Sequence, residues 1–424
     1  MNKNFLALGL AAALLAPQVA GAEGFAINEW SAEGVAMGGA RMFAEDDAAN
    51  VAYNPASITK VKGEVMKSSY TYLSPHGNYK LYDSNNDEIK GEPTHNKVHA
   101  GWAVGSYYVR QINDKEWFGI GAFPRFAMVS EFERASKAST NAFFSKLNGV
   151  SVTPTYAHKF DKKWSAAVGA EINYVGLELQ KNLVIPTAGV NGTTQIEGES
   201  YALGWNAAAN YAFDDKNEIG VVYRSRIKHS LEADLKGYGT KSPASPLVGS
   251  NDVFGNAYGV VTLPDSWDIG YNHKFDKKTR LELKATRTNW STYDALNVYF
   301  DKSLVGIPGI AESSPSAKNW SNGWRYAIGL EHNFSDKYAA MAGFAFDESS
   351  IPHDGGDFMV PTGLRRTYSI GARYNDKKQT VAVALGWMDV GTLDFAGHAT
   401  DAYKSAHAYD SFTKIASISY QRKF

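Results

Sequence analysis

The stretch YALGWNAAANYAFDDK, from Tyr201 to Lys216, decides the fold class of this chain. Its large apolar residues fall on one set of alternate positions, and small or polar residues fill the positions between them. A helix would place apolar residues three and four positions apart, whereas a half-buried strand alternates with a period of two. The stretch is therefore predicted to be a β-strand that ends near Phe213 in an Asp-Asp-Lys turn.

Five other short polar motifs resemble this turn, and alternating segments flank them. Asp, Asn and Ser favour tight turns because their side chains bond nearby backbone groups. The six predicted turns are Ile112–Lys115, Phe160–Lys163, Phe213–Lys216, Phe275–Lys278, Phe334–Lys337 and Tyr374–Lys378. Six turns require twelve strands, and one more strand is expected before them, near Glu64–Leu73, and one after them, near Ser411–Phe424. The prediction is an antiparallel sheet of fourteen strands.

Aromatic residues lie beside these turns rather than in the middle of the strands. They are Trp164, Phe213, Phe275, Phe334 and Tyr374. A soluble sandwich would bury its aromatics in mid-strand, whereas a transmembrane barrel carries aromatic girdles at the membrane interfaces, with short periplasmic turns and long outer loops. The last strand also ends on Phe424, which resembles the assembly signal of bacterial outer-membrane barrels. We therefore expect an all-β, 14-stranded antiparallel transmembrane β-barrel in the outer membrane, with the barrel-assembly machinery as a partner through Phe424.

The composition hides this architecture. The 424 residues are 44% hydrophobic with a mean hydropathy of −0.33, values that suit a soluble β-protein. The 43 basic and 44 acidic residues balance, so no nucleic-acid partner is expected. The absence of cysteine excludes disulfides and thiolate metal sites. Lys3, the apolar run Phe5–Ala16 and the small residues Ala20–Ala22 predict a signal peptide over residues 1–22.

Residues 23–62 do not read as a membrane strand. They are rich in Ala and Gly and lack sustained alternation. A barrel of fourteen strands is too wide for its own side chains to fill. We therefore expect this segment to form an N-terminal hatch inside the lumen of a barrel spanning 63–424. A disordered periplasmic tail is the alternative.

Several motifs in the mature chain resemble the FadL-type outer-membrane transport family, whose members carry hydrophobic molecules. They are Gly24–Glu29, Ser31–Gly34, Ala44–Ala48, Asn54–Ala56, Leu263–Trp267 and Phe344–Ser349. The resemblance implies a fourteen-stranded barrel with an internal hatch. It also implies that a ligand docks among the outer loops, moves to a pocket against the hatch, and leaves sideways through the barrel wall opposite a kink in the third strand.

The third strand, Trp117–Met128, contains a residue that interrupts strand pairing. Pro124 has no N–H to donate to a neighbouring strand, so a break is expected there. Members of the family often have a glycine slightly later, where this chain has Arg125 and Phe126, which leaves the size of any side opening undecided. A plain edge bulge is the alternative.

Candidate ligand contacts come from the hatch, the third strand and two apolar outer loops. They are Phe25, Ile27, Asn54, Pro55, Phe123, Arg125, Phe126, Phe143, Phe144, Leu304 and Ile307. The hatch motif itself comprises Gly24, Asp46, Asp47, Asn54, Pro55 and Ala56. Apolar loop residues are typical of ligand or partner surfaces, although lipid contact at the rim would also explain them.

A fatty-acid carboxylate would require a basic side chain in an otherwise apolar pocket. The candidates by position are Arg41, Arg125, Arg325 and Arg373. The alternative is that each of these arginines pairs with a carboxylate of the protein, such as Glu171 or Glu331.

No motif indicates catalysis, a cofactor or a metal, so an enzyme is not expected. The expected function is passive transport of hydrophobic compounds, above all long-chain fatty acids, by a monomer surrounded by outer-membrane lipid and lipopolysaccharide. The alternatives are a water-filled porin, a monoaromatic-hydrocarbon transporter of the same fold, and a structural or adhesive surface protein.

Overall fold

The computed structural model describes residues 24–92, 95–98, 100–185, 190–238, 252–293, 295–301, 313–399 and 401–424. The predicted signal peptide and the candidate ligand contacts Leu304 and Ile307 lie outside the described residues.

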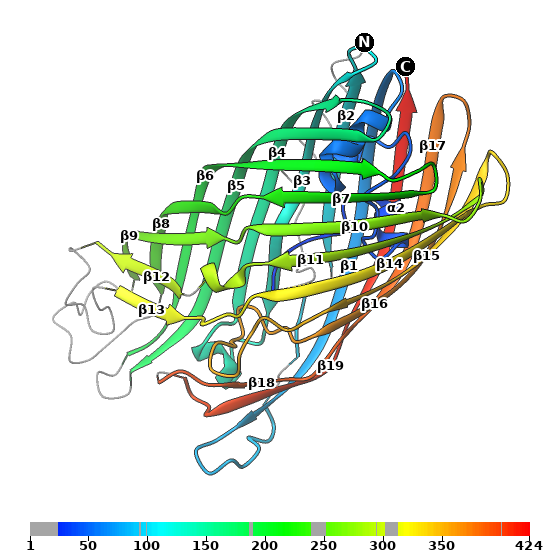
Figure 1. Ribbon diagram of the computed structural model, residues 1–424. Coiled ribbons are helices and arrows are strands. Elements are labelled where there is room, and N and C mark those ends of the chain that lie inside the picture. Colours follow the sequence, from blue (N-terminus) through cyan, green and yellow to red (C-terminus); the bar gives the residue numbers. More distant parts are fainter. Residues whose placement is uncertain are drawn as a thin grey trace.

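The strands form one antiparallel sheet that closes where β1 pairs with β19 (Figure 1). Nine crossings are single strands: β1 (Glu64–Tyr82), β2 (Gly101–Gln111), β3 (Glu116–Glu131), β4 (Phe144–Lys159), β5 (Trp164–Ile185), β6 (Val190–Ala212), β15 (Tyr338–Asp347), β16 (Arg365–Asn375) and β19 (Ser405–Lys423). Five crossings are split: β7 (Asn217–Arg224) with β8 (Ile227–Tyr238), β10 (Ser266–Lys274) with β9 (Asp252–Leu263), β11 (Thr279–Thr288) with β12 (Ala295–Phe300), β14 (Gly323–Asn333) with β13 (Ser313–Ala317), and β17 (Gln379–Val390) with β18 (Leu393–Ala396). The predicted closed barrel of fourteen crossings is therefore confirmed.

All six predicted turns join neighbouring strands, and their shared chemistry explains the repeated motif. In the turn at Phe160–Lys163, Asp161 Oδ1 accepts hydrogen bonds from the N–H groups of Lys163 and Trp164, at 2.7 and 2.8 Å. These backbone bonds lower the pKa of Asp161, because they stabilise its ionised form. Asp276 and Asp376 make the same pair of bonds in their turns.

The two faces of the wall differ in chemistry. Large apolar side chains such as Ile328 and Leu385 are exposed on the outside, where lipid surrounds the barrel. Carboxylates, amides and hydroxyl groups on the alternate positions are buried inside, as Glu171 and Asn210 illustrate. Among the described residues, no helix has the length and apolar character needed to cross a membrane.

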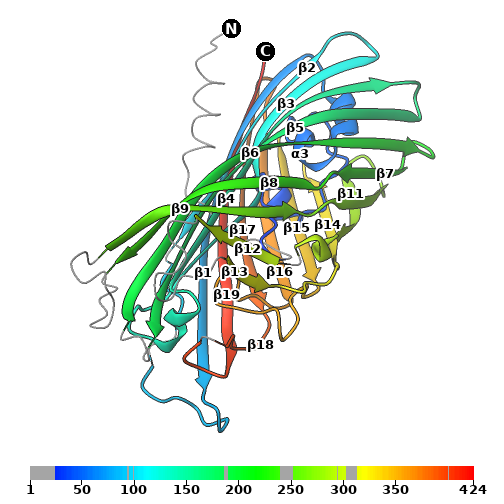
Figure 2. The same ribbon diagram turned by 90° about the vertical axis from the view of Figure 1, so that its left-hand side faces the viewer.

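Residues Gly24–Val61 lie within the barrel, and we call them the hatch segment (Figure 2). They contain the short helices α2 (Ala32–Ala36) and α3 (Asn50–Tyr53) and the 3₁₀ helix η1 (Pro55–Lys60). Nearly every side chain of the segment is buried, and α2 packs against β15, β16, β17 and β19. Two further 3₁₀ turns, η2 (Lys137–Thr140) and η4 (Trp290–Thr292), lie outside the hatch segment.

Four neighbouring crossings break between their two segments at corresponding points. The breaks are Ser225–Arg226, Pro264–Asp265, Asn289–Tyr293 and Lys318–Asn322. Between these breaks and the tight turns, the rings of Trp205, Tyr223 and Trp267 form a row on the outside of the wall. The ring centroid of Tyr223 is 5.0 Å from that of Trp205 and 4.6 Å from that of Trp267. The segments β8, β9, β12 and β13 lie on the far side of the breaks from the tight turns, and we call them the outer flap (Figure 1).

Candidate functional site

The strand β3 leaves the barrel wall halfway along its length. Its burial alternates up to Ile120, but the next eight residues, Gly121–Met128, are all buried. Its ladder with β2 ends at the pair Ser106–Ala122, and its register with β4 shifts between Pro124 and Phe126. The break predicted at Pro124 is therefore present, and β3 is covered on both faces from this point onward. We call the region between β2 and this part of β3 the wall window.

The beginning of the hatch segment takes the place of a neighbouring strand at the wall window. The N–H of Ile27 donates to the carbonyl of Arg125 at 2.8 Å, and the N–H of Ala127 donates to the carbonyl of Phe25 at 2.9 Å. Trp30 Nε1 donates to the carbonyl of Pro124 at 2.6 Å. The backbone groups that β3 loses from β2 are thus satisfied by the hatch segment.

The side chain of Phe25 lies among four other aromatic rings on the other side of this contact. Its ring centroid is 4.7 Å from Trp290, 5.3 Å from Tyr293, 5.8 Å from Trp320 and 6.0 Å from Phe126. We call these five residues the aromatic box. Phe25 is fully buried, so the chain itself occupies the box.

Gly24 lets Phe25 reach the box. Its φ of +62° is in the left-handed region, and a Cβ there would lie 2.6 Å from a ring carbon of Trp320. We expect Gly24→Ala to disturb the bridge between the hatch segment and β3. Amide exchange at Ile27 should accelerate about tenfold, because a left-handed alanine costs about 1–2 kcal/mol before any clash. Gly63→Ala is the matched control: its φ is +71°, but its nearest neighbour would be 4.0 Å away. Equal exchange at Ile27 in both variants would contradict this prediction.

An apolar track continues from the aromatic box along the inner face of the outer flap. The cluster that contains Phe25 also holds side chains from β4, β5, β8, β9 and β12: Leu147, Val175, Leu177, Leu179, Ile227, Leu231, Leu235, Val261, Leu263, Leu296 and Val298. We call this cluster, together with the box, the apolar chamber. Its side chains are buried and packed against one another, and they extend from the outer flap to β3 at the wall window.

The four candidate arginines are already paired with protein carboxylates. Arg125 contacts Glu171 at 2.8 Å, and Arg325 contacts Asp347 at 2.7 Å. Arg41 and Arg373 both contact Glu331, at 2.9 and 2.6 Å. The pairing alternative, with Glu171 and Glu331 as partners, therefore describes the geometry of three of the four. Arg125 also lies over the ring of Phe126, 5.0 Å from its centroid, at the edge of the aromatic box.

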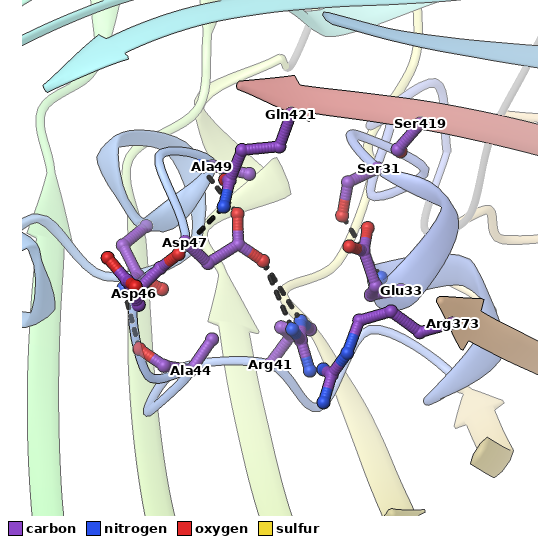
Figure 3. Close-up of polar contacts among 12 residues, drawn as sticks. Ser31, Glu33, Arg41, Ala44, Asp46, Asp47, Ala49, Arg373, Ser419 and Gln421 are labelled. Atoms are coloured by element: carbon purple, nitrogen blue, oxygen red, sulfur yellow. Dashed lines mark hydrogen bonds and ion pairs between the residues drawn. The ribbon is translucent and has the colours of Figure 1, made fainter. Parts of the chain in front are cut away.

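A buried ionic cluster fixes the middle of the hatch segment to the wall. Arg41 bridges Asp47 and Glu331, and Lys67 on β1 bridges Glu33 and Asp47 at 2.8 and 2.9 Å. Figure 3 shows Asp47 turned toward Arg41, with Gln421 of β19 beside it. Gln421 accepts from the N–H of Ala48 at 3.1 Å and donates to the carbonyl of Asp46 at 2.8 Å. Since each carboxylate has a charged or amide partner, the cluster is a structural anchor.

The remaining residues of the predicted hatch motif shape and attach the segment. Asn54 caps η1 by accepting from the N–H of Ala56 at 3.1 Å, and Pro55 takes the first helical position. The amide of Asn54 donates to Asn210 on β6 at 2.7 Å, and Asp46 pairs with Lys423. Ile27 and Phe123 pack in the core around Trp30, next to the wall window. Of the candidate contacts that the structure describes, only Phe25, Phe126 and Arg125 meet at the aromatic box.

The apolar outer loop predicted around Phe143 and Phe144 is largely strand, because β4 begins at Phe144. Phe143 is buried beneath Arg134, whose guanidinium lies 4.8 Å from the ring centroid. Neighbouring loops form an outer cap: Asn141 Nδ2 contacts His398 Nδ1 at 2.9 Å and Asp401 at 3.1 Å, and Asn141 Oδ1 accepts from the N–H of Phe358.

The outer cap should loosen at alkaline pH. A hydrogen bond with Asp401 raises the pKa of His398 above its ordinary 6.5. A raised pKa contributes stability that is full below the unfolded value and is lost as the pH rises through the folded value. Protease cleavage in the loop containing His398 should therefore be slower at pH 6 than at pH 8.5. The variant His398→Gln should remove that difference, and a difference that persists would contradict the assignment.

The sequence did not single out Trp290, Tyr293 and Trp320. All three lie in breaks between strand segments, where the alternation that identifies strands stops. An available signal was a cluster of aromatics outside the period-two pattern, which the motif Trp290–Tyr293 displays.

Comparisons with known proteins identify the family of the chain and agree with its closed barrel. The family model described as outer membrane protein transport protein (OMPP1/FadL/TodX) matches residues 13–424. The chain belongs to the OMPP1/FadL/TodX family. The long-chain fatty acid transport protein of Escherichia coli K12 is 23% identical, over 90% of this chain and 91% of its own.

Solved structures of the OMPP1/FadL/TodX family share the fold. A FadL homologue of Pseudomonas aeruginosa superposes with a TM-score of 0.82 at 18% identity, covering 95% of this chain and all of the other. The toluene transporter TodX of Pseudomonas putida gives 0.70 at 16% identity, over 94% of this chain and 99% of the other. Its membership of this family makes the chain a bacterial outer-membrane transport protein, and the solved structures share its multi-strand barrel.

Proposed function

We propose that this protein carries hydrophobic compounds passively across the outer membrane, through the apolar chamber and sideways past the hatch segment. One observation carries the proposal: the aromatic box lies directly against the wall window, where β3 is paired with the hatch segment instead of β2. A ligand that displaces Phe25 would pass from one apolar environment to another. Burial of apolar surface is worth about 25 cal/mol per Å², so a route that avoids water is strongly favoured for such molecules.

We propose long-chain fatty acids as the principal substrates. The side chains of the apolar chamber extend from the outer flap to the aromatic box, so an extended acyl chain would contact more of them than a compact molecule would. The relatives include a protein named for long-chain fatty acid transport. Monoaromatic hydrocarbons are the second candidate, supported by the edge-to-face rings around Phe25, which would hold a ligand ring in the place of Phe25.

Uptake measurements separate these possibilities. Cells that express the protein should take up labelled oleate faster than cells without it, and labelled toluene should reveal any preference for aromatics. Trp290→Ala should reduce uptake of the preferred compound, whereas Trp387→Ala, on the lipid face, should not. Uptake equal to that of cells without the protein would overturn the proposal. Steady ion conductance of the purified wild type in a planar bilayer would favour a porin instead.

A further inference from the structure

Among the other interruptions of the barrel wall, one lies between β6 and the crossing formed by β7 and β8. The ladder ends at the pair Asn206–Arg224 and resumes at Glu199–Glu232. Between these pairs, residues 200–205 of β6 and residues 225–231 form no ladder pairs with each other. The structure describes all of these residues. The opposite edge of β6 stays paired with β5 throughout. Unpaired strand edges are costly in a membrane, so this gap calls for an explanation.

Side chains close the gap where the backbone does not. At the end of the gap next to β7, the N–H of Ser225 donates to the carbonyl of Trp205, and the N–H of Trp205 donates to Ser225 Oγ, both at 2.9 Å. Beyond them Ile227 packs against Gly204, so closely that a Cβ on Gly204 would lie 2.8 Å from Ile227 Cγ1. His229 reaches across β6 to Asn173 on β5, with Nε2 2.9 Å from the amide oxygen. Both Ile227 and His229 are fully buried.

The gap has apolar surroundings on both sides. Inside, Ile227 belongs to the apolar chamber, and Ala202 packs against it while remaining partly exposed. Outside, Leu203 and Tyr201 are 77% and 71% exposed, the highest values among the large apolar side chains of the described residues. The ring of Tyr201 lies 5.0 Å from that of Tyr174, at the outer end of the lipid-facing strand surface. The gap is therefore at the level of the outer leaflet.

We propose that this gap is a second lateral portal, through which hydrophobic molecules dissolved in the outer leaflet pass between β6 and β8 into the apolar chamber. Ile227 and His229 form its gate. A side-chain gate opens without breaking a ladder, because the strand pairing around it is already absent. The portal rests on the proposed function, since it supplies the chamber from which the wall window is reached. It differs from the wall window, which hatch backbone fills.

Reversible blocking of the portal with a thiol reagent tests this proposal. The chain has no native cysteine, so the reagent can react only with a cysteine that is introduced. Ala202→Cys places a thiol on the inner face of the gap, and benzyl methanethiosulfonate supplied in the lipid phase should react with it. Oleate uptake should then fall by at least half and recover when a reductant removes the benzyl group. Val168→Cys on β5 is the control: it is 57% exposed on the lipid face, in a strand paired on both sides, and its modification should leave uptake unchanged.

Each outcome of this experiment is decisive. A thiol at position 202 that does not react in a correctly assembled barrel overturns the portal, as does reaction without any change in uptake. Ile227→Ala supplies a second measurement, because shrinking the gate should accelerate both thiol modification and uptake. Heat-resistant gel mobility verifies that each variant forms a barrel. The absence of oleate uptake by the wild type would refute the proposed function, whereas a reactive thiol at position 202 would still report access through the gap.

Discussion

Glu331→Ala is expected to release the hatch segment from the wall. Its carboxylate contacts Arg41 of the hatch segment at 2.9 Å, and Arg280 of β11 and Arg373 of β16 at 2.8 and 2.6 Å. Removing it leaves three guanidinium groups crowded together without their shared anion. Breaking a buried ion pair in this way costs about 3–5 kcal/mol. The cost should fall on the attachment of the hatch segment, because the ladders around β14 do not depend on this side chain.

Ion conductance in a planar bilayer measures this effect. The wild type, with its lumen occupied, should conduct poorly, and Glu331→Ala should show frequent openings while keeping its heat-resistant gel mobility. Asp389→Ala is the matched control, because its pair with Arg366 is half exposed, and such pairs contribute about 0–1 kcal/mol. If the two variants conduct alike, the ionic cluster does not hold the hatch segment.

Ile328→Arg is expected to destabilise the barrel itself. Ile328 is 40% exposed on the lipid face at the centre of β14, between Trp324 near one end and the turn at Phe334–Lys337. An arginine near the bilayer midplane costs about 2–4 kcal/mol in such barrels. The midpoint of unfolding in urea, followed by gel mobility, should fall accordingly.

Tyr174→Arg provides the comparison for Ile328→Arg. The sequence pattern alone places Tyr174 as deep as Ile328, but its hydroxyl donates to Glu199 at 3.0 Å, at the outer end of the apolar surface of β5. Near the interface an arginine costs only about 0–1 kcal/mol. Equal losses of stability in the two variants would show that the membrane lies elsewhere on the barrel.

The sequence predicted the barrel well because strands and turns depend on local chemistry. Alternation along Tyr201–Phe213 and the Asp-containing turns determine strand direction, faces and count without information from distant residues. The break in β3 was also predictable, because Pro124 lacks a donor wherever it stands. The split crossings were not, because each looks like one strand followed by a loop.

The candidate site was predicted only in part because it is assembled by long-range contacts. Phe25 and Phe126 were recognised from their segments, but their neighbours Trp290 and Trp320 come from breaks far along the chain. The partners of the charged residues could not be predicted either. The sequence contains Arg41 and Glu331, but only the closed barrel brings the guanidinium and the carboxylate within 2.9 Å of each other. The local pattern identifies a lumen-facing arginine, but its role depends on a partner that lies hundreds of residues away.

The contacts between the hatch segment and β19 have a consequence for the order of folding. The N–H of Ala32 donates to Ser419 at 2.8 Å, and that of Ala48 donates to Gln421, so the hatch segment bonds to the last strand. Contacts this far apart in sequence form slowly, since a long loop must close before they contribute. The hatch segment, which is near the start of the chain, therefore cannot complete these bonds until the last strand is in place, and we expect its capture to be the closing step of folding.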